Sequence, residues 1–146
     1  MKRKLFLLIC GIVAVSAFFA GCTARVNKDN DLSADDIVGL VGAKFDDFKK
    51  TIGNVEQDIA DAGSARYSYK RSILGIDSNI AVTMDSKGDK VERVVVYTDK
   101  EHIDKWRSVL GKRYGEGISD SWKDDHTRVK ITDDGKTAII SIENIA

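Results

Sequence analysis

The chain has 146 residues, with 23 basic and 23 acidic side chains, two cysteines and no proline. This length is sufficient for one domain with a single hydrophobic core. A formal net charge of zero argues against the strongly basic surface with which proteins bind nucleic acid, so we expect no nucleic-acid partner.

Residues 1–21 have the layout of a secretory signal peptide. A basic segment, residues 2–4, precedes a charge-free run, residues 5–20, which ends in small residues. This run is shorter than the roughly 20 apolar residues of a comfortable membrane span, although an uncleaved membrane anchor is the alternative. We therefore expect residues 1–21 to be removed.

The segment Phe19-Ala20-Gly21-Cys22 resembles a bacterial lipobox, in which a Leu, a small residue and a Gly or Ala precede an invariant Cys. Phe19 departs from the usual Leu. The resemblance implies that the Cys22 thiol receives diacylglycerol, that the chain is cut before Cys22, and that the new amino group is acylated, for example with palmitate. Two or three acyl chains hold a protein stably at a bilayer, whereas one does not.

The resemblance further implies a lipoprotein of the cell envelope that faces the periplasm or the exterior. Thr23 matches the pattern for sorting to the outer membrane if the host is Gram-negative. Cys10 would be lost with the signal and Cys22 used for the lipid, so we expect no disulfide. Three basic residues and no acidic ones lie in residues 1–21, so the remainder carries 20 basic and 23 acidic side chains.

Residues 22–32 are polar and non-periodic, which indicates a flexible tether; an ordered first strand is the alternative. Residues 33–146 are expected to form one domain. Ser33 and Asp36 have the spacing of a capping box at the start of a short helix. A second helix is expected to end at Gly53, with Phe45, Phe48 and Ile52 on one face.

From Arg66 the hydrophobic period changes to two, which predicts antiparallel strands at residues 66–73, 79–84 and 91–98, with a turn at 85–90. The run Val94-Val95-Val96 predicts a central strand covered on both faces. A helix capped by Thr98 should follow, with Glu101 completing a capping box. Its apolar stripe is Ile103, Trp106, Leu110 and Tyr114.

The glycine-rich residues 111–117 are expected to form a helix C-cap and turn, because they lack the order of a phosphate-binding loop. Two final strands, residues 127–131 and 137–142, should form a hairpin. The predicted fold is therefore α+β, with two short helices, a meander, a third helix and a C-terminal hairpin, the helices packing on one face of a sheet.

Residues 37–54 resemble the opening of small envelope domains of the outer-membrane assembly accessory and β-lactamase-inhibitor type. Gly42 and Gly53 match the glycine positions of those families, while the proline that commonly follows is missing. The resemblance implies a short helix followed by a three- or four-stranded meander, and a binding role. It transfers no site residues.

The sequence contains no recognisable catalytic or metal-binding constellation, and we expect no enzyme activity, metal or cofactor. His102 has no second His nearby in the sequence. His126 follows Asp124 and Asp125, but a solvated loop is favoured over a carboxylate-oriented base, since no partner nucleophile lies in a known motif.

Tyr, Trp and Arg are enriched at interface hot spots, which makes one group of residues a candidate binding surface. The group is Tyr67, Tyr69, Arg71, Trp122 and Arg128, with Lys70 beside them. Packing of the three aromatic residues in the core or at a strand edge is the alternative.

The preferred hypothesis is a non-catalytic lipoprotein domain that binds another envelope protein, as an assembly accessory or inhibitor. The alternatives are a small-ligand-binding or sensor lipoprotein, an enzyme acting through His126, and a structural or stress-response lipoprotein.

Overall fold

The computed structural model describes residues 31–53, 56–61 and 64–146, and the fold is α+β, as predicted. Its elements in chain order are β1 (Asp31–Leu32), α2 (Ala34–Gly39), α3 (Phe45–Ile52), β2 (Glu56–Asp61), β3 (Ser64–Ile73), β4 (Ile76–Met84), β5 (Val91–Asp99), the 3₁₀ turn η1 (Lys100–His102), α4 (Ile103–Tyr114), β6 (Ser121–Lys123), β7 (Thr127–Asp133) and β8 (Thr137–Asn144). The predicted signal peptide and the predicted lipidation site Cys22 lie outside the described residues. Among those that are described, no helix is long and apolar enough to cross a membrane.

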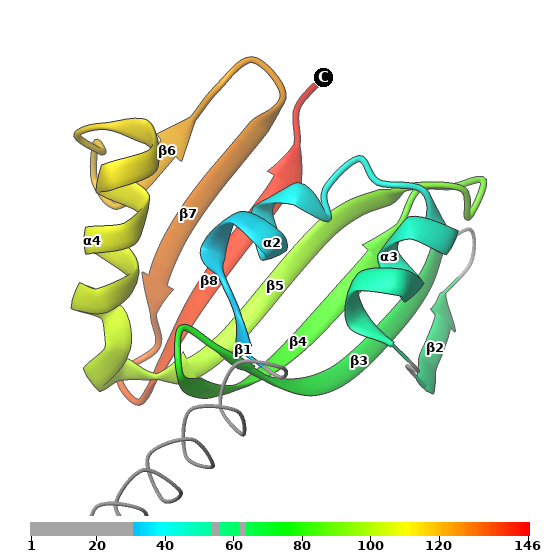
Figure 1. Cartoon of the computed structure of the whole chain (residues 1–146), viewed down its shortest axis with the longest axis horizontal. Helices are drawn as coiled ribbons and strands as arrows, with labels where there is room; N and C mark the ends of the chain where they lie inside the picture. The colour runs from blue at the N-terminus through cyan, green and yellow to red at the C-terminus, as the bar shows by residue number, and fades with distance from the viewer. Residues whose placement is uncertain (1–30, 54–55, 62–63) are drawn as a thin grey trace, which may run out of the picture. The chain divides into compact units, whose positions relative to one another are not determined.

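All of the strands form one sheet, in the order β1-β3-β4-β5-β8-β7-β6, with β2 paired to β3 (Figure 1). The predicted meander (β3–β5) and hairpin (β7–β8) are both present, but β5 pairs with β8 and makes them continuous. The sheet is larger than predicted, since β1, β2 and β6 were not expected as strands. Strands of two or three residues, such as β1 and β6, are too short to show a period of two.

β1 also corrects the predicted extent of the tether. Residues 22–32 were expected to be flexible, yet Asp31–Leu32 form a strand, and the carbonyl of Leu32 accepts a 2.9 Å hydrogen bond from the amide of Leu74. The alternative of an ordered first strand therefore describes these two residues.

The hydrophobic core lies between one face of the sheet and the three helices. The buried strand residues all belong to the alternating set that faces this side, including Ile80, Val82, Val96 and Ile140. From the helices, the core receives Ile37, Phe48, Ile52, Trp106 and Leu110. The opposite side of the sheet, named here the open face, has none of these helices over it (Figure 1).

A bulge in β5 keeps the apolar residues of that strand on the core side. The register shifts where Met84 pairs with Val91 while Thr83 pairs with Arg93, so one extra residue is accommodated in β5. Val91 and Val94 are thereby both fully buried although they are three residues apart. Val95, on the open face, is only half-buried, so the prediction that this strand is covered on both faces was wrong.

The predicted start of the first helix and the predicted stop of the second are confirmed. Ser33 Oγ accepts from the Asp36 amide at 3.1 Å, and the Asp36 carboxylate accepts from the Ser33 amide at 2.8 Å, which is a complete capping box. α3 is stopped by its C-cap Gly53, whose φ of 85° is a conformation that favours glycine.

The third helix has its predicted apolar stripe but different ends. Thr98 is not the cap: it continues β5 by pairing with Ala138, and its hydroxyl is buried. The 3₁₀ turn η1 then precedes α4. Gly111, expected in the C-cap and turn, lies inside α4, which ends at Tyr114 with Gly115 as its cap.

Candidate functional site

Three of the residues predicted to form an exposed binding surface face the core side instead. Tyr67, Tyr69 and Arg71 pair with Val82, Ile80 and Ser78, all of which are buried. The three side chains therefore point toward α3 and not toward solvent on the open face. The predicted surface was wrong in this respect, because a period of two identifies two faces but does not say which one a helix covers.

Tyr67 and Tyr69 instead form an aromatic cluster with α3. The ring of Tyr67 lies 5.1 Å from that of Phe45, and the ring of Tyr69 lies 6.2 Å from that of Phe48. Arg71 donates to the carbonyl of Ile52 at the end of the same helix. Burial raises the pKa of the Tyr69 hydroxyl well above its ordinary value of 10.0, so this group stays protonated.

Trp122 is also a packing residue, with only 7% of its surface exposed. Its indole Nε1 donates to the carbonyl of Gly115 at 3.2 Å, and Gly117 lies directly against the ring. Of the five predicted residues, Arg128 alone lies on the open face, in β7 opposite Glu143.

The open face carries polar and cationic side chains arranged in rows across the strands. Successive pairings place one residue from each strand at the same level. The arginine row, as we name it, is Arg66, Thr83, Arg93, Glu143, Arg128 and Lys123, from β3 to β6. Neighbours in such a row are about 4.8 Å apart across the sheet.

Two further rows run parallel to the first on the same face. The floor row is Ser68, Ala81, Val95, Ser141, Lys130 and Ser121, from β3 to β6. Its members from β3 to β8 are small and half-buried, whereas Lys130 in β7 is exposed. The tyrosine row, two residues further along each strand, is Lys70, Asn79, Tyr97, Ile139 and Thr132. From β3 to β8, the floor row is thus lower than the rows of longer side chains on either side of it.

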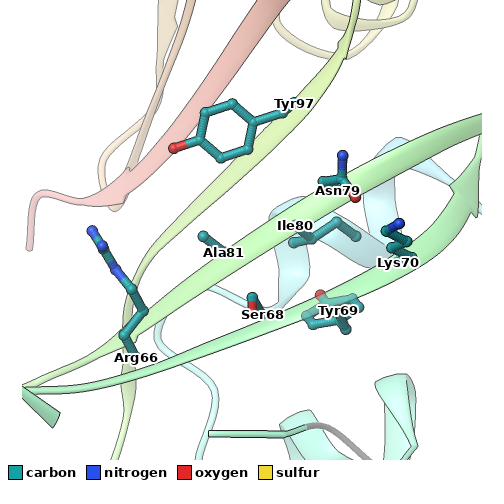
Figure 2. Close-up of a pocket in the computed structure, with 8 residues that line it drawn as sticks. All are labelled: Arg66, Ser68, Tyr69, Lys70, Asn79, Ile80, Ala81 and Tyr97. Atoms are coloured by element: carbon teal, nitrogen blue, oxygen red, sulfur yellow. The ribbon is translucent and has the colours of Figure 1, made fainter. Parts of the chain in front are cut away.

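This difference in height produces a hollow of about 360 Å³ over β3, β4 and β5 (Figure 2). Arg66 stands at one end and Lys70 at the other, with Ser68 and Ala81 between them. The ring of Tyr97 lies along β5 beside the hollow, and 37% of its surface is exposed. The hollow therefore offers two cations and one aromatic ring around a floor of small residues.

The cations of this face differ from those elsewhere in how they are paired. Of the six arginines in the described part of the chain, Arg66 and Arg128 are the two whose side chains have no hydrogen bond or ion pair with described residues, and both belong to the arginine row. Arg93, between them, pairs with Glu143 at 2.8 Å. Two guanidinium groups are therefore available to an anionic partner.

The Asp124 carboxylate, two residues before His126 in the sequence, binds backbone amides of its own turn. The Asp124 carboxylate accepts from the backbone amides of His126 and Thr127, at 2.8 and 2.7 Å. These bonds lower the pKa of Asp124, and they fix the loop that leads into β7. The carboxylate thus has a structural role in the turn, and it does not orient the imidazole.

One group of potential metal ligands exists in the described residues. Asp99, Glu101 and His102 have ligand atoms within 4.8 Å of one another, and His102 Nε2 lies 3.4 Å from a Glu101 oxygen. Both carboxylates are exposed, and clusters of this kind are common on protein surfaces without an ion. Sequence reasoning missed this group because it looked for a second histidine.

Comparisons of the chain with models of protein families, with curated proteins and with solved structures found no match.

Proposed function

We propose that this protein is a lipid-anchored component of a bacterial cell envelope, whose domain binds another envelope protein through the open face. The carrying observation is that none of the described helices lies over this face, and that the side chains of Arg66 and Arg128 have no hydrogen bond or ion pair with described residues. Exposed arginine and tyrosine side chains are typical of binding surfaces.

The anchor and the open face complement each other in this proposal. The lipobox-like segment ending at Cys22 provides the attachment, and a short tether then leads to β1. Attachment to the same membrane as the partner raises the effective concentration of the partner at the domain. A moderate affinity of the open face is then sufficient, which suits a surface of exposed, polar contacts.

Protein binding is favoured over the alternatives on structural grounds. Small-molecule sites usually enclose most of their ligand, whereas the hollow at Arg66 and Lys70 lies on the surface of the sheet. An enzyme acting through His126 would need a carboxylate that orients the imidazole, and Asp124 binds backbone amides of the turn instead. The proposed role agrees with that implied by the resemblance to assembly accessories and inhibitors.

The test is a crosslinking pull-down of the natively lipidated protein from membranes, beside the Cys22→Ser variant. We expect one partner in stoichiometric amount, and less of it with Cys22→Ser, because that variant loses the lipid. Recovery of no partner above background from the lipidated protein would contradict the proposed function.

A further inference from the structure

The arginine row and the floor row together form a linear feature, named here the cross-strand track. Arg66 in β3 and Arg128 in β7 are separated by the three intervening strands β4, β5 and β8. Four strand spacings place their backbones about 19 Å apart. An extended polypeptide covers this distance with about six residues, at roughly 3.3 Å per residue.

We propose that the cross-strand track binds an extended acidic segment of the partner protein, which runs across the strands from Arg66 to Arg128. This inference rests on the proposed function, because it identifies the chemistry of the segment that the open face recognises. One carboxylate of the segment pairs with Arg66, and a second pairs with Arg128. The residues between them lie over the floor row.

The domain itself contains an example of this pairing. Glu143 stands in the arginine row between Arg93 and Arg128, and its carboxylate lies 2.8 Å from Arg93. An acidic side chain is therefore compatible with the level of the row and with the height of its cations. At Arg66 the paired residues are Thr83 in β4 and Ile59 in β2, neither of which is acidic.

The floor row explains why an extended chain fits between the rows. From β3 to β8, Ser68, Ala81, Val95 and Ser141 have short side chains, which leave room above the sheet. In β7 the row continues with Lys130, an exposed cation two residues from Arg128 that adds to the positive charge at this end. On the far side of the floor, Tyr97 and Ile139 pair with each other across β5 and β8. They offer an apolar contact for a side chain in the middle of the segment.

The charge of the whole chain favours a local acidic segment over a large polyanion. After residues 1–21, acidic residues outnumber basic ones by 23 to 20, so the protein as a whole repels nucleic acid and anionic membrane. The attraction is confined to the few cations of the track. A short acidic segment is long enough to meet these cations and too short to meet much of the remaining, acidic surface.

The test uses the natively lipidated protein in a neutral detergent and measures fluorescence anisotropy of labelled peptides. The probes are an octapeptide of alternating Glu and Thr and a matched octapeptide of alternating Lys and Thr. We expect the Glu peptide to bind and the Lys peptide not to bind. We also expect binding of the Glu peptide to weaken as salt is raised, because exposed ion pairs are screened.

Replacing single arginines of the track with glutamate shows where on the domain the Glu peptide binds. Arg66→Glu and Arg128→Glu should each weaken binding of the Glu peptide about tenfold, the effect of losing one ion pair and adding repulsion. Lys112→Glu, an exposed cation on α4, is the matched control and should leave binding unchanged. Arg66→Gln and Arg128→Gln serve as milder versions, and unfolding midpoints verify that each variant is folded.

The proposal is overturned if the Glu peptide does not bind, or if it binds equally well to Arg66→Glu, Arg128→Glu and wild type. Binding of phosphatidylglycerol vesicles that both reversals abolish, without binding of the Glu peptide, would assign the face to a membrane and also overturn it. If the pull-down still recovers its partner when Arg66→Glu and Arg128→Glu are combined, the proposed binding at the cross-strand track is wrong, while the proposed function stands. If the pull-down recovers no partner from wild type, the proposed function fails.

Discussion

Gly117 shows at the scale of a residue how closely the segment after α4 is fitted. A Cβ atom on this residue would lie 2.4 Å from Cε2 and 2.5 Å from Nε1 of Trp122, distances that side-chain carbons do not tolerate. Only the hydrogen of glycine allows the backbone to rest on the indole. The contact holds β6 against the core, and with it the Lys123 end of the arginine row.

Gly117→Ala should therefore lower the free energy of unfolding by about 1–3 kcal/mol, the usual cost of overpacking a buried contact. Gly111→Ala is the matched control: it lies inside α4 with no atom within 4 Å of the added Cβ, and alanine should gain up to about 1 kcal/mol. Chemical denaturation measures both. A Gly117→Ala protein as stable as wild type would contradict the assigned packing of Trp122.

Asp120 occupies a conformation that few residues adopt, with a φ of 56°. Its carboxylate accepts two hydrogen bonds from Arg107, at 2.8 and 2.7 Å, and these bonds lower its pKa below the ordinary value of 3.8. The folded state thus binds the proton less readily than the unfolded state. The stabilisation by the Asp120 carboxylate is therefore fully present above the pKa that this group has in the unfolded protein. It is lost as the pH falls through the lower pKa that the group has in the folded protein.

We expect the free energy of unfolding to be nearly constant from pH 8 to 5 and to fall below about pH 4, since Asp124, Asp133 and Asp134 are shifted in the same direction. Asp120→Asn should reduce the steepness of this fall, while asparagine still accepts the backbone conformation. Chemical denaturation at several pH values measures this pH dependence for the wild type and the variant. A protein that becomes more stable on acidification would disprove the sign of this linkage.

At the scale of an element, α2 depends on its first turn because it is only six residues long. The capping box of Ser33 and Asp36 satisfies two amides that the helix would otherwise leave without partners. Ser33→Ala should cost about 1 kcal/mol of stability. Ser86→Ala, exposed in the β4–β5 turn, is the control and should have no measurable effect; equal effects of the two would argue against the cap.

Elements defined by local chemistry could be predicted from the sequence. The cap at Ser33, the stop at Gly53 and the glycine-centred turns each depend on residues close together in the chain. The strands β3, β4 and β5 were found because their hydrophobic period extends over many residues. β6 was missed because three residues contain too little of any pattern, and Trp122 was accordingly placed on a surface.

The rows of the open face could not be predicted, because they depend on pairing between distant strands. Arg66 and Arg128 lie at the same level only because β5 pairs with β8, and this pairing sets the register of both hairpins. The sequence shows that Arg66 and Tyr67 point to opposite sides. It does not show that α3 covers the side of Tyr67, so the tyrosines were assigned to the binding surface and Arg66 was overlooked.

At the scale of the whole molecule, the formal net charge is zero, but the arginine side chains are not all paired within the fold. The guanidinium groups of Arg71, Arg107 and Arg113 bind residues of the fold itself, whereas those of Arg66 and Arg128 have no hydrogen bond or ion pair with the residues that the structure describes. The sheet is thus supported on one side by its core and offers cations on the other. A domain built in this way suits the proposed capture of a partner at the membrane.

Binding of a partner through the open face is tested most directly by site-specific photocrosslinking in intact cells. A photoreactive phenylalanine replaces either Tyr97 on the open face or Lys112 on α4. We expect an adduct with one envelope protein from position 97 and none from position 112. The adduct should weaken when Arg66→Glu and Arg128→Glu are combined. No adduct from position 97, or an equal one from position 112, would contradict binding through the open face.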